Sequence, residues 1–267
     1  MSSAPQIAVG TTFCPELPLA EALPMIAAAG FTHVAVGADA EHYKPLMAGG
    51  GAAEMRRRIE DCGLLVDSVH GKADLTESNS FRFARSRAEL AAELGARAVV
   101  LHVSPKDLGE GDVQGCLEEV LEACDRLYMP ARNSGVLFAL ENVAPGPAEE
   151  LVEAAVSALD AGPFGFCFDS SNAWSGEPEV HGPLERLGKR LAVAHLSDRS
   201  SDEAVHQVPG EGKIDWDGLC AALRAAGFEG PLTIEACTRC SKWQDPAEFL
   251  REAAAAGRRL WSQVREE

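Results

Sequence analysis

One pattern repeats eight times along this chain: a short apolar run with strand character, then a longer segment with helical character. Successive runs begin about 26 to 40 residues apart, the length of one strand–helix unit. Eight such units in a row are typical of an α/β fold, the (β/α)8 TIM barrel. The predicted strands are residues 7–9, 33–36, 64–69, 98–101, 136–142, 164–168, 191–194 and 232–234. The predicted helices are residues 17–29, 52–62, 81–94, 113–133, 148–159, 184–189, 216–226 and 246–261.

No linker rich in proline or serine separates these units, so we expect residues 1–267 to form a single TIM-barrel domain. The alternative is a doubly wound open sheet. Such a sheet usually carries a glycine-rich phosphate loop after its first strand. Here Gly10 is followed by Thr-Thr-Phe, which is not a loop of that kind, and the barrel is therefore favoured.

The run 136–142, Val-Leu-Phe-Ala-Leu-Glu-Asn, carries a carboxylate to the end of a strand buried on both faces. A carboxylate there costs free energy unless it meets a partner or a metal ion. A single acid of this kind could be structural, bonded to backbone amides or to a basic side chain. The same pattern recurs, however, because six consecutive predicted strands end in an acid or a histidine: His70, His102, Glu141, Asp169, His195 and Glu235.

The carboxyl ends of barrel strands surround one opening, the barrel mouth, where active sites lie. Two glutamates, an aspartate and a histidine at this mouth offer oxygen and nitrogen ligands for one divalent ion: Mn, Mg, Co or Zn. A glycine-containing loop, residues 206–216, follows the seventh strand and brings His206 back toward the mouth. Asp215 is positioned to cap the helix after that loop.

The sequences around these residues resemble the xylose isomerase-like TIM-barrel superfamily, described as sugar phosphate isomerases/epimerases and related to endonuclease IV. The resemblance covers essentially the whole chain. It rests on Ala-Leu-Glu-Asn at Glu141, Phe-Asp-Ser-Ser-Asn at Asp169, Ala-His-Leu-Ser-Asp at His195, the run from His206 to Trp216, and Thr-Ile-Glu-Ala at Glu235. It implies a single-metal site formed by Glu141, Asp169, His195 and Glu235. It also implies that both glutamates transfer protons while they ligate the ion.

Departures from endonuclease IV argue against a nucleic-acid partner. That family has a histidine where this chain has Asn172 and an aspartate where it has Ala204, so only His206 remains of its third metal site. The net charge of -17 also disfavours phosphate binding. His70 and His102 match endonuclease IV ligands. In a one-metal enzyme we interpret them as substrate contacts or as a second, weaker metal site.

Ketose 3-epimerases of the superfamily fit less well. Asn172 departs from their Asp-x-x-His motif, Pro147 stands where they have a second glutamate, and Ser201 stands where they have an arginine, although Arg199 is near. The resemblance implies a metal-dependent isomerase or epimerase of a small sugar, sugar acid or inosose, which removes a proton next to a metal-bound carbonyl. A lyase of the inosose or dehydroshikimate dehydratase type is the alternative, and a non-catalytic sugar-binding barrel is a third. The candidate substrate-binding residues are His70, His102, Asn172, His206, Arg199 and Trp174.

The remaining features bear on environment. The amino-terminal residues lack the features of a signal peptide, and no stretch approaches a membrane span, so we expect a cytoplasmic protein without a membrane partner. The chain has eight cysteines, and Cys237-Thr-Arg-Cys240 is a lone C-x-x-C motif without a second pair for a zinc site, which indicates reduced thiols. The sequence leaves open the phosphorylation state of the substrate, the metal and a homo-oligomeric state.

Overall fold

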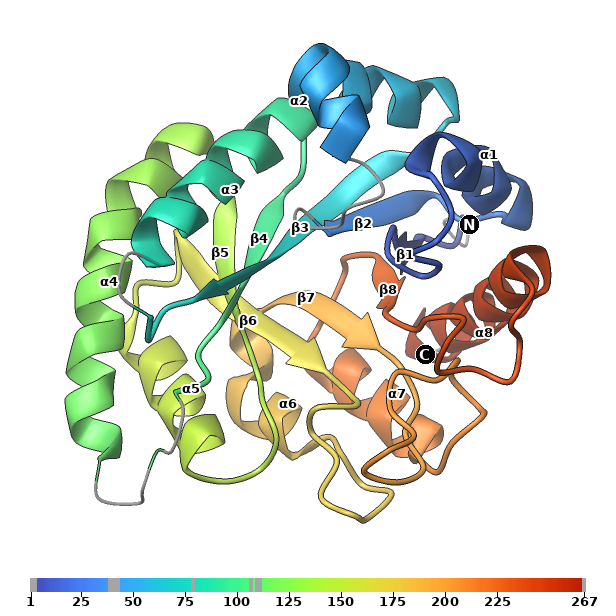
Figure 1. Cartoon of the computed structure of the whole chain (residues 1–267). Coiled ribbons are helices and arrows are strands. Elements are labelled where there is room, and N and C mark those ends of the chain that lie inside the picture. Colours follow the sequence, from blue (N-terminus) through green and yellow to red (C-terminus); the bar gives the residue numbers. More distant parts are fainter. Residues whose placement is uncertain (1–3, 38–43, 78–79, 106–107, 109–111, 266–267) are drawn as a thin grey trace.

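The computed structural model describes residues 4–37, 44–77, 80–105, 108 and 112–265; for residues 45–49 and 71–73 it describes only the backbone. Eight parallel strands pair in chain order and close into a barrel, as predicted (Figure 1). The strands are β1 (Ile7–Gly10), β2 (His33–Gly37), β3 (Leu65–Asp74), β4 (Ala98–His102), β5 (Leu137–Glu141), β6 (Phe164–Asp169), β7 (Leu191–Leu196) and β8 (Leu232–Ile234).

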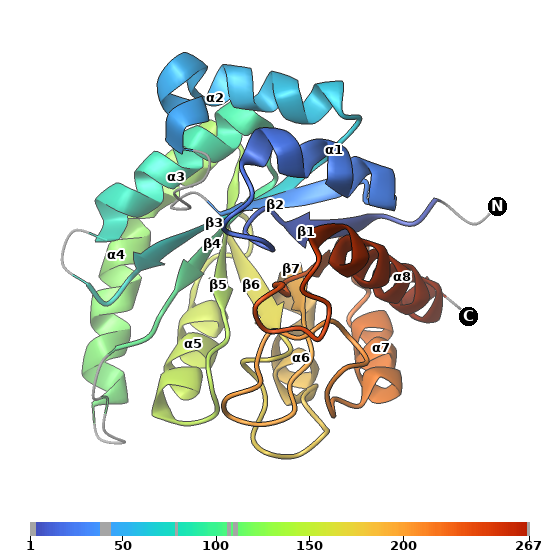
Figure 2. The same ribbon diagram turned by 45° about the vertical axis from the view of Figure 1, so that its right-hand side comes forward.

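One α-helix follows each strand, and the helices form a ring around the barrel (Figure 1). They are α1 (Leu19–Ala29), α2 (Lys44–Asp61), α3 (Ser80–Leu94), α4 (Val113–Ser134), α5 (Pro147–Ala158), α6 (Gly182–Leu187), α7 (Trp216–Ala225) and α8 (Pro246–Arg265); a 3-10 turn, η2 (Gly188–Arg190), follows α6. Figure 2 shows β1 and α8, the first strand and the last helix, on one side of the molecule. Among the described residues, no helix is both long and apolar enough to cross a bilayer.

Side chains on the strands alternate between two apolar layers, because successive residues of a strand point to opposite faces. The larger layer lies between barrel and helices. The smaller layer fills the barrel interior and consists of Ala98, Val100, Ala139, Cys167 and Val193. Four of these five residues lie two positions before a predicted site residue on the same strand. The interior layer is therefore the floor of the barrel mouth.

The observed elements differ from the predicted ones mainly at their ends. β3 continues beyond His70 to Asp74, with a register shift against β4 between these two residues. Helix α2 starts at Lys44, eight residues before the predicted start, and has a non-helical residue at Gly51. Apolar periodicity locates the buried centre of each element, whereas its ends depend on hydrogen bonds to neighbouring segments.

Candidate active site

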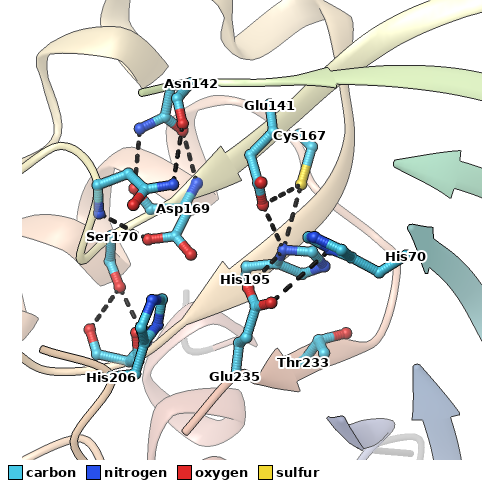
Figure 3. Close-up of polar contacts among 12 residues, drawn as sticks. His70, Glu141, Asn142, Cys167, Asp169, Ser170, His195, His206, Thr233 and Glu235 are labelled. Atoms are coloured by element: carbon cyan, nitrogen blue, oxygen red, sulfur yellow. Dashed lines mark hydrogen bonds and ion pairs between the residues drawn. The ribbon is translucent and has the colours of Figure 1, made fainter. Parts of the chain in front are cut away.

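The ends of β5 to β8 bring the four predicted metal ligands to the mouth (Figure 3). Glu141 and Asp169 are the last residues of β5 and β6, His195 lies one residue before the end of β7, and Glu235 directly follows β8. The register pairs Asp169 with His195 across the β6–β7 ladder. Glu141, Asp169 and His195 are each no more than 3% exposed.

The imidazole of His195 lies between the two glutamates. Its Nδ1 atom is 2.6 Å from Glu141 Oε1 and 2.7 Å from Glu235 Oε2. One N–H cannot point straight at two oxygens, and the hydrogen bond goes to Glu141, which leaves Glu235 Oε2 buried without a hydrogen bond. Two carboxylates thus converge on one nitrogen, an arrangement that favours a positive charge between them.

The two histidines of β3 and β4 complete this side of the mouth. His70 Nε2 lies 3.1 Å from His102 Nε2, and His102 Nε2 lies 3.1 Å from Glu141 Oε2. His70 Nδ1 is 3.7 Å from Glu235 Oε1, and the rings of His70 and His195 stack with centroids 5.3 Å apart. The histidines therefore connect the two glutamates around the rim.

The tightest group of candidate ligands differs in one member from the predicted set. Ligand atoms of His70, Glu141, His195 and Glu235 all lie within 4.8 Å of one another, whereas Asp169 is not part of this group. Asp169 Oδ1 accepts a hydrogen bond from the Asn172 backbone N–H at 2.7 Å, and its Oδ2 is buried without a partner. The structure thus brings His70 into the cluster and leaves one oxygen of Asp169 free beside it.

Both glutamates are ionised in this setting. Burial opposes the charged form of Glu141, but His70 and hydrogen bonds from His102 and His195 hold its pKa well below the usual range. Burial also opposes the charged form of Glu235, while His195 and His70 lower its pKa to about 2. For His195, burial disfavours the charge, but Cys167 and the two glutamates raise its pKa well above the ordinary value.

Asp169 behaves in the opposite way. Burial and the negative charges of Glu235 and Glu141 raise its pKa well above the usual range, which favours its protonated form. The pKa values of the other two histidines move apart. Burial lowers the pKa of His70. Burial also opposes the charged form of His102, but the hydrogen bond to Glu141 and the negative charges of Glu141, Glu235 and Asp74 together raise its pKa.

These residues fit a divalent cation. Three carboxylates and imidazole nitrogens are the oxygen and nitrogen ligands that Mn, Co and Zn accept. Glu235 Oε2, Asp169 Oδ2 and His70 Nδ1 are buried without a hydrogen-bond partner, so each has an unused lone pair or proton. A cation bound among these atoms would give each of them a partner. It would also supply the positive charge that His195 and the proton on Asp169 otherwise provide.

Asn142 holds the ends of β5 and β6 together, a role that the sequence analysis missed. Its side chain accepts a hydrogen bond from the Asp169 N–H at 2.6 Å and donates one to the Asp169 carbonyl at 2.9 Å. Asn172 donates from its side chain to the Asn142 carbonyl at 3.1 Å. The asparagine directly after Glu141 in the sequence was the available signal.

Asp198 organises the loop after β7, and it too was missed. Its carboxylate accepts hydrogen bonds from the backbone N–H groups of Gly210 (2.7 Å) and Ile214 (3.1 Å) and from the Trp216 indole (2.9 Å). Its backbone pairs with Gln207 in an isolated bridge. The loop is therefore fastened to the end of β7 at several points.

The other predicted substrate-binding residues differ in how free their side chains are to contact a substrate. His206 has a left-handed backbone (φ 50°), and its Nδ1 lies 3.3 Å from Ser197 Oγ, directly after β7. The Arg199 guanidinium bonds to the carbonyls of Ser171 and Ser201 and to the Asp202 carboxylate. Trp174 is 6% exposed and packs in the outer apolar layer.

Cys167 lies beneath the cluster, on the barrel floor. Its Sγ is 3.6 Å from both Glu141 Oε1 and His195 Nδ1. Burial raises the pKa of this thiol well above the ordinary value. Only the apolar run of β6 surrounds it in sequence, so nothing there distinguished it from a small core residue.

Comparison with known proteins places this chain in a family. Residues 23–257 match the family described as Xylose isomerase-like TIM barrel. The chain is 27% identical over 247 residues to y4fM of Sinorhizobium fredii, covering 80% of this chain and 79% of that protein. It is 29% identical over 175 residues to the probable endonuclease 4 of Mycobacterium tuberculosis, covering 61% of this chain and 65% of that protein.

Solved structures show the same fold at low identity. A D-psicose 3-epimerase from Clostridium cellulolyticum H10, crystallised with D-tagatose, superposes with a TM-score of 0.75 at 16% identity, covering 97% of this chain and 99% of that one. The IolI protein with a bound zinc atom gives 0.76 at 16%, covering 97% and 98%. The strands close into a barrel, and the family model matches most of the chain. The chain therefore belongs to the Xylose isomerase-like TIM barrel family.

Proposed function

We propose that this protein is a divalent-metal-dependent isomerase or epimerase of a small sugar, sugar acid or inosose. One observation carries the proposal: Glu141 and Glu235, from two different strands, approach the same nitrogen of His195 at 2.6 and 2.7 Å. Such a pair can hold a cation and move protons. Sugar epimerases and a zinc-binding protein of the same fold support the proposed substrate class and the metal.

Glu141, Asp169, His195 and Glu235 would hold one divalent ion: Mn, Mg, Co or Zn. His70, whose ligand atom lies in the same cluster, is available to the ion or to the substrate. When bound, the ion supplies Lewis acidity, which polarises a substrate carbonyl and stabilises negative charge on its oxygen. Asn142 fixes the backbone of Asp169, and the apolar floor beneath the cluster keeps water out.

Proton transfer is the task of the two glutamates. A carboxylate that ligates through one oxygen keeps the other free to take a proton from the carbon next to the carbonyl. Glu141 and Glu235 come from β5 and β8, three strands apart in the ring, and so face the substrate from different sides. One removes the proton and the other returns it on the opposite face, which inverts that carbon.

The remaining predicted contacts are assigned to substrate binding. His102 and His70 present ring nitrogens at the mouth, and His206 lies on the loop after β7, next to Ser197. Asn172 and Arg199 lie in the loops after β6 and β7, whereas Trp174 packs in the outer apolar layer and is not free to stack on a substrate. The substrate is a small polyhydroxylated carbonyl compound, because hydroxyl groups match this set of donors and acceptors.

A lyase is the second candidate, and one observation favours it. His70 and His102 lie 3.1 Å apart, and His102 contacts Glu141 at 3.1 Å, so a proton can pass along these groups to a leaving hydroxyl. Loss of a β-hydroxyl before the proton returns would give a dehydratase of the inosose or dehydroshikimate type. Both enzymes start with removal of the same proton, which a non-catalytic sugar-binding barrel would not perform.

Solvent-isotope exchange tests this first step. The protein, loaded with Mn or Zn, is incubated in deuterated water with a panel of ketohexoses, keto sugar acids and inososes. We expect deuterium at the carbon next to the carbonyl of one of these compounds. Glu141→Gln and Glu235→Gln should each slow that exchange by roughly 10²–10⁴-fold, the usual contribution of a general base.

The matched control is Glu122→Gln on α4, whose carboxylate is exposed and distant from the mouth and should leave the rate unchanged. Full exchange in both glutamine variants would disprove the two-glutamate mechanism. A dehydrated product would select the lyase.

The endonuclease 4 relatives raise a competing function, and we propose that this chain does not share it. The net charge of -17 opposes approach of a phosphate backbone. Asn172 and Ala204 lack the ligating groups that the resemblance requires for a third metal. We expect no nicking of a duplex with an abasic site in the presence of zinc and manganese, assayed by gel electrophoresis. Cleavage at a repair enzyme's rate would overturn the assignment.

A further inference from the structure

The turn after β8 contains two cysteines that the proposed function does not use. Cys237 and Cys240 are the ends of the Cys-Thr-Arg-Cys motif; both are free and partly exposed. The Cys240 N–H donates to the Cys237 carbonyl at 3.1 Å, and the Ser241 N–H donates to the same oxygen at 3.2 Å. The four residues therefore form one tight turn that opens to solvent.

The turn brings the backbones of the two cysteines close enough for a disulfide. A backbone hydrogen bond from residue i+3 to residue i brings the two Cα atoms within about 7 Å. Disulfides join Cα atoms about 4.4 to 6.8 Å apart.

The turn is also connected to the proposed metal site. Cys237 follows Glu235 by two residues, and its N–H donates to the His206 carbonyl at 3.3 Å. The next residue, Thr238, donates its N–H to the Phe13 carbonyl at 2.8 Å, which joins the turn to the loop after β1. Movement of this turn therefore reaches Glu235, His206 and the β1 loop together.

We propose that Cys237 and Cys240 are a dithiol oxidation site, which hydrogen peroxide or a small-molecule disulfide converts reversibly to a Cys237–Cys240 disulfide that loosens the metal site. The link to the metal site rests on the function proposed above, whereas formation of the disulfide does not.

With peroxide, the Cys237 sulfur attacks one oxygen, the O–O bond breaks, and a sulfenic acid and water form. The Cys240 sulfur then attacks the sulfenic sulfur, the S–O bond breaks, and a second water leaves. The two thiols lose two electrons and two protons in total, and the peroxide is reduced to two waters.

The disulfide would act on the site by bonding two sulfurs that are separate thiols in the structure. The bond holds the sulfurs about 2.05 Å apart. The turn tightens, and the strain reaches Cys237, whose N–H holds the His206 carbonyl and whose chain continues into Glu235. Disturbing a group that orients a metal ligand typically weakens binding 10–100-fold, and we expect about tenfold.

Peptide mapping tests the disulfide directly. Trypsin cleaves after Arg239, between the two cysteines, and so separates residues 225–239 from residues 240–242. After treatment of the full-length protein with hydrogen peroxide and blocking of free thiols, mass spectrometry should find these two peptides joined. Dithiothreitol should release them.

Cys240→Ser should abolish the joined species, and the matched control Cys116→Ser on α4 should leave it unchanged. A joined peptide containing Cys14, which lies on the neighbouring β1 loop, would contradict the assignment. So would overoxidised or wholly unmodified cysteines at 237 and 240.

The effect on the site is measured separately as the Kd of manganese in the oxidised and reduced protein by titration calorimetry. Roughly tenfold weaker binding after oxidation, restored by dithiothreitol and absent in Cys240→Ser, is expected. Equal affinities would overturn the link to the metal site. A reduced protein that binds no metal would contradict the proposed function instead, and the peptide map would still decide the disulfide.

Discussion

Opposite ends of this barrel bury carboxylates in different ways. Toward the amino end, Asp67 is fully buried, and Arg97 Nε lies 2.6 Å from its Oδ1. Thr233 contacts the other oxygen at 3.3 Å. At the mouth, Glu141 and Glu235 meet the imidazole of His195 instead.

A guanidinium keeps its charge at every physiological pH, whereas an imidazole can lose it near neutrality. The amino end therefore carries a permanent countercharge within the chain. The mouth holds its carboxylates with groups that can give way to a cation. Buried acids thus serve stability at one end and reversible binding at the other.

The largest expected effect concerns the ion pair of Asp67 and Arg97. Arg97→Met leaves Asp67 buried without its charge partner and should lower the free energy of unfolding by roughly 3–5 kcal/mol. Urea denaturation measures this. Adding Asp67→Asn should recover much of the loss, because the uncompensated charge is removed. The affinity for manganese should be unchanged in the double variant; a loss of binding there would show that the two ends are not independent.

The pH dependence of metal binding should reveal whether a bound ion replaces protons on Asp169 and His195. The raised pKa of Asp169 means that its proton stabilises the metal-free fold at low pH, and this contribution is lost as pH rises through the folded pKa. Because the pKa of Glu235 is lowered to about 2, the stability that its charge contributes is lost only as the pH falls toward that value. Below the raised pKa values of Asp169 and His195 the ion must therefore displace protons from both residues, which a series of titrations between about pH 5.5 and 7.5 would detect.

Calorimetry should find about one ion bound per chain, with an affinity that rises about tenfold per pH unit for each proton displaced. Proton release should be visible as a dependence of the heat on the buffer. An affinity that stays constant over this pH range would argue that the ion does not replace those protons.

The smallest effect has the opposite sign to that of Arg97→Met. Asp169→Asn keeps an oxygen for the Asn172 N–H and removes an unfavourable buried acid. The metal-free protein should gain roughly 1 kcal/mol in urea denaturation near neutral pH, because the folded acid must take up a proton to be neutral and the amide need not. Metal affinity should fall by at least about tenfold. If the variant were destabilised without metal, Asp169 would be structural, like Asp67.

Much of the architecture could be predicted because it follows from local periodicity. The eight strands, their order and the convergence of six polar residues at the mouth need only the repeat pattern and the geometry of a closed barrel. The exchange of Asp169 for His70 in the tightest cluster could not be predicted, because it depends on strand stagger and side-chain rotamers.

Hydrogen-bond partners that lie far apart in the sequence could not be predicted either. Thr233 contacts Asp67 across 166 positions of the chain, and neither residue belongs to a motif that suggests the other. Asn142 and Asp198 stand inside recognised motifs, but their roles depend on which backbone groups the loops present to them. Sequence patterns identify groups that face a mouth, whereas these long-range hydrogen bonds require the folded loops.

The carboxylate of Asp198 has a consequence for protein engineering. Because it binds the N–H groups of Gly210 and Ile214 and the indole of Trp216, the segment 206–216 and residue 198 form one discontinuous unit. A transplant of this rim onto another barrel must carry both parts. Libraries that randomise the loop while keeping Asp198, Gly210 and Trp216 would vary specificity on a preserved frame.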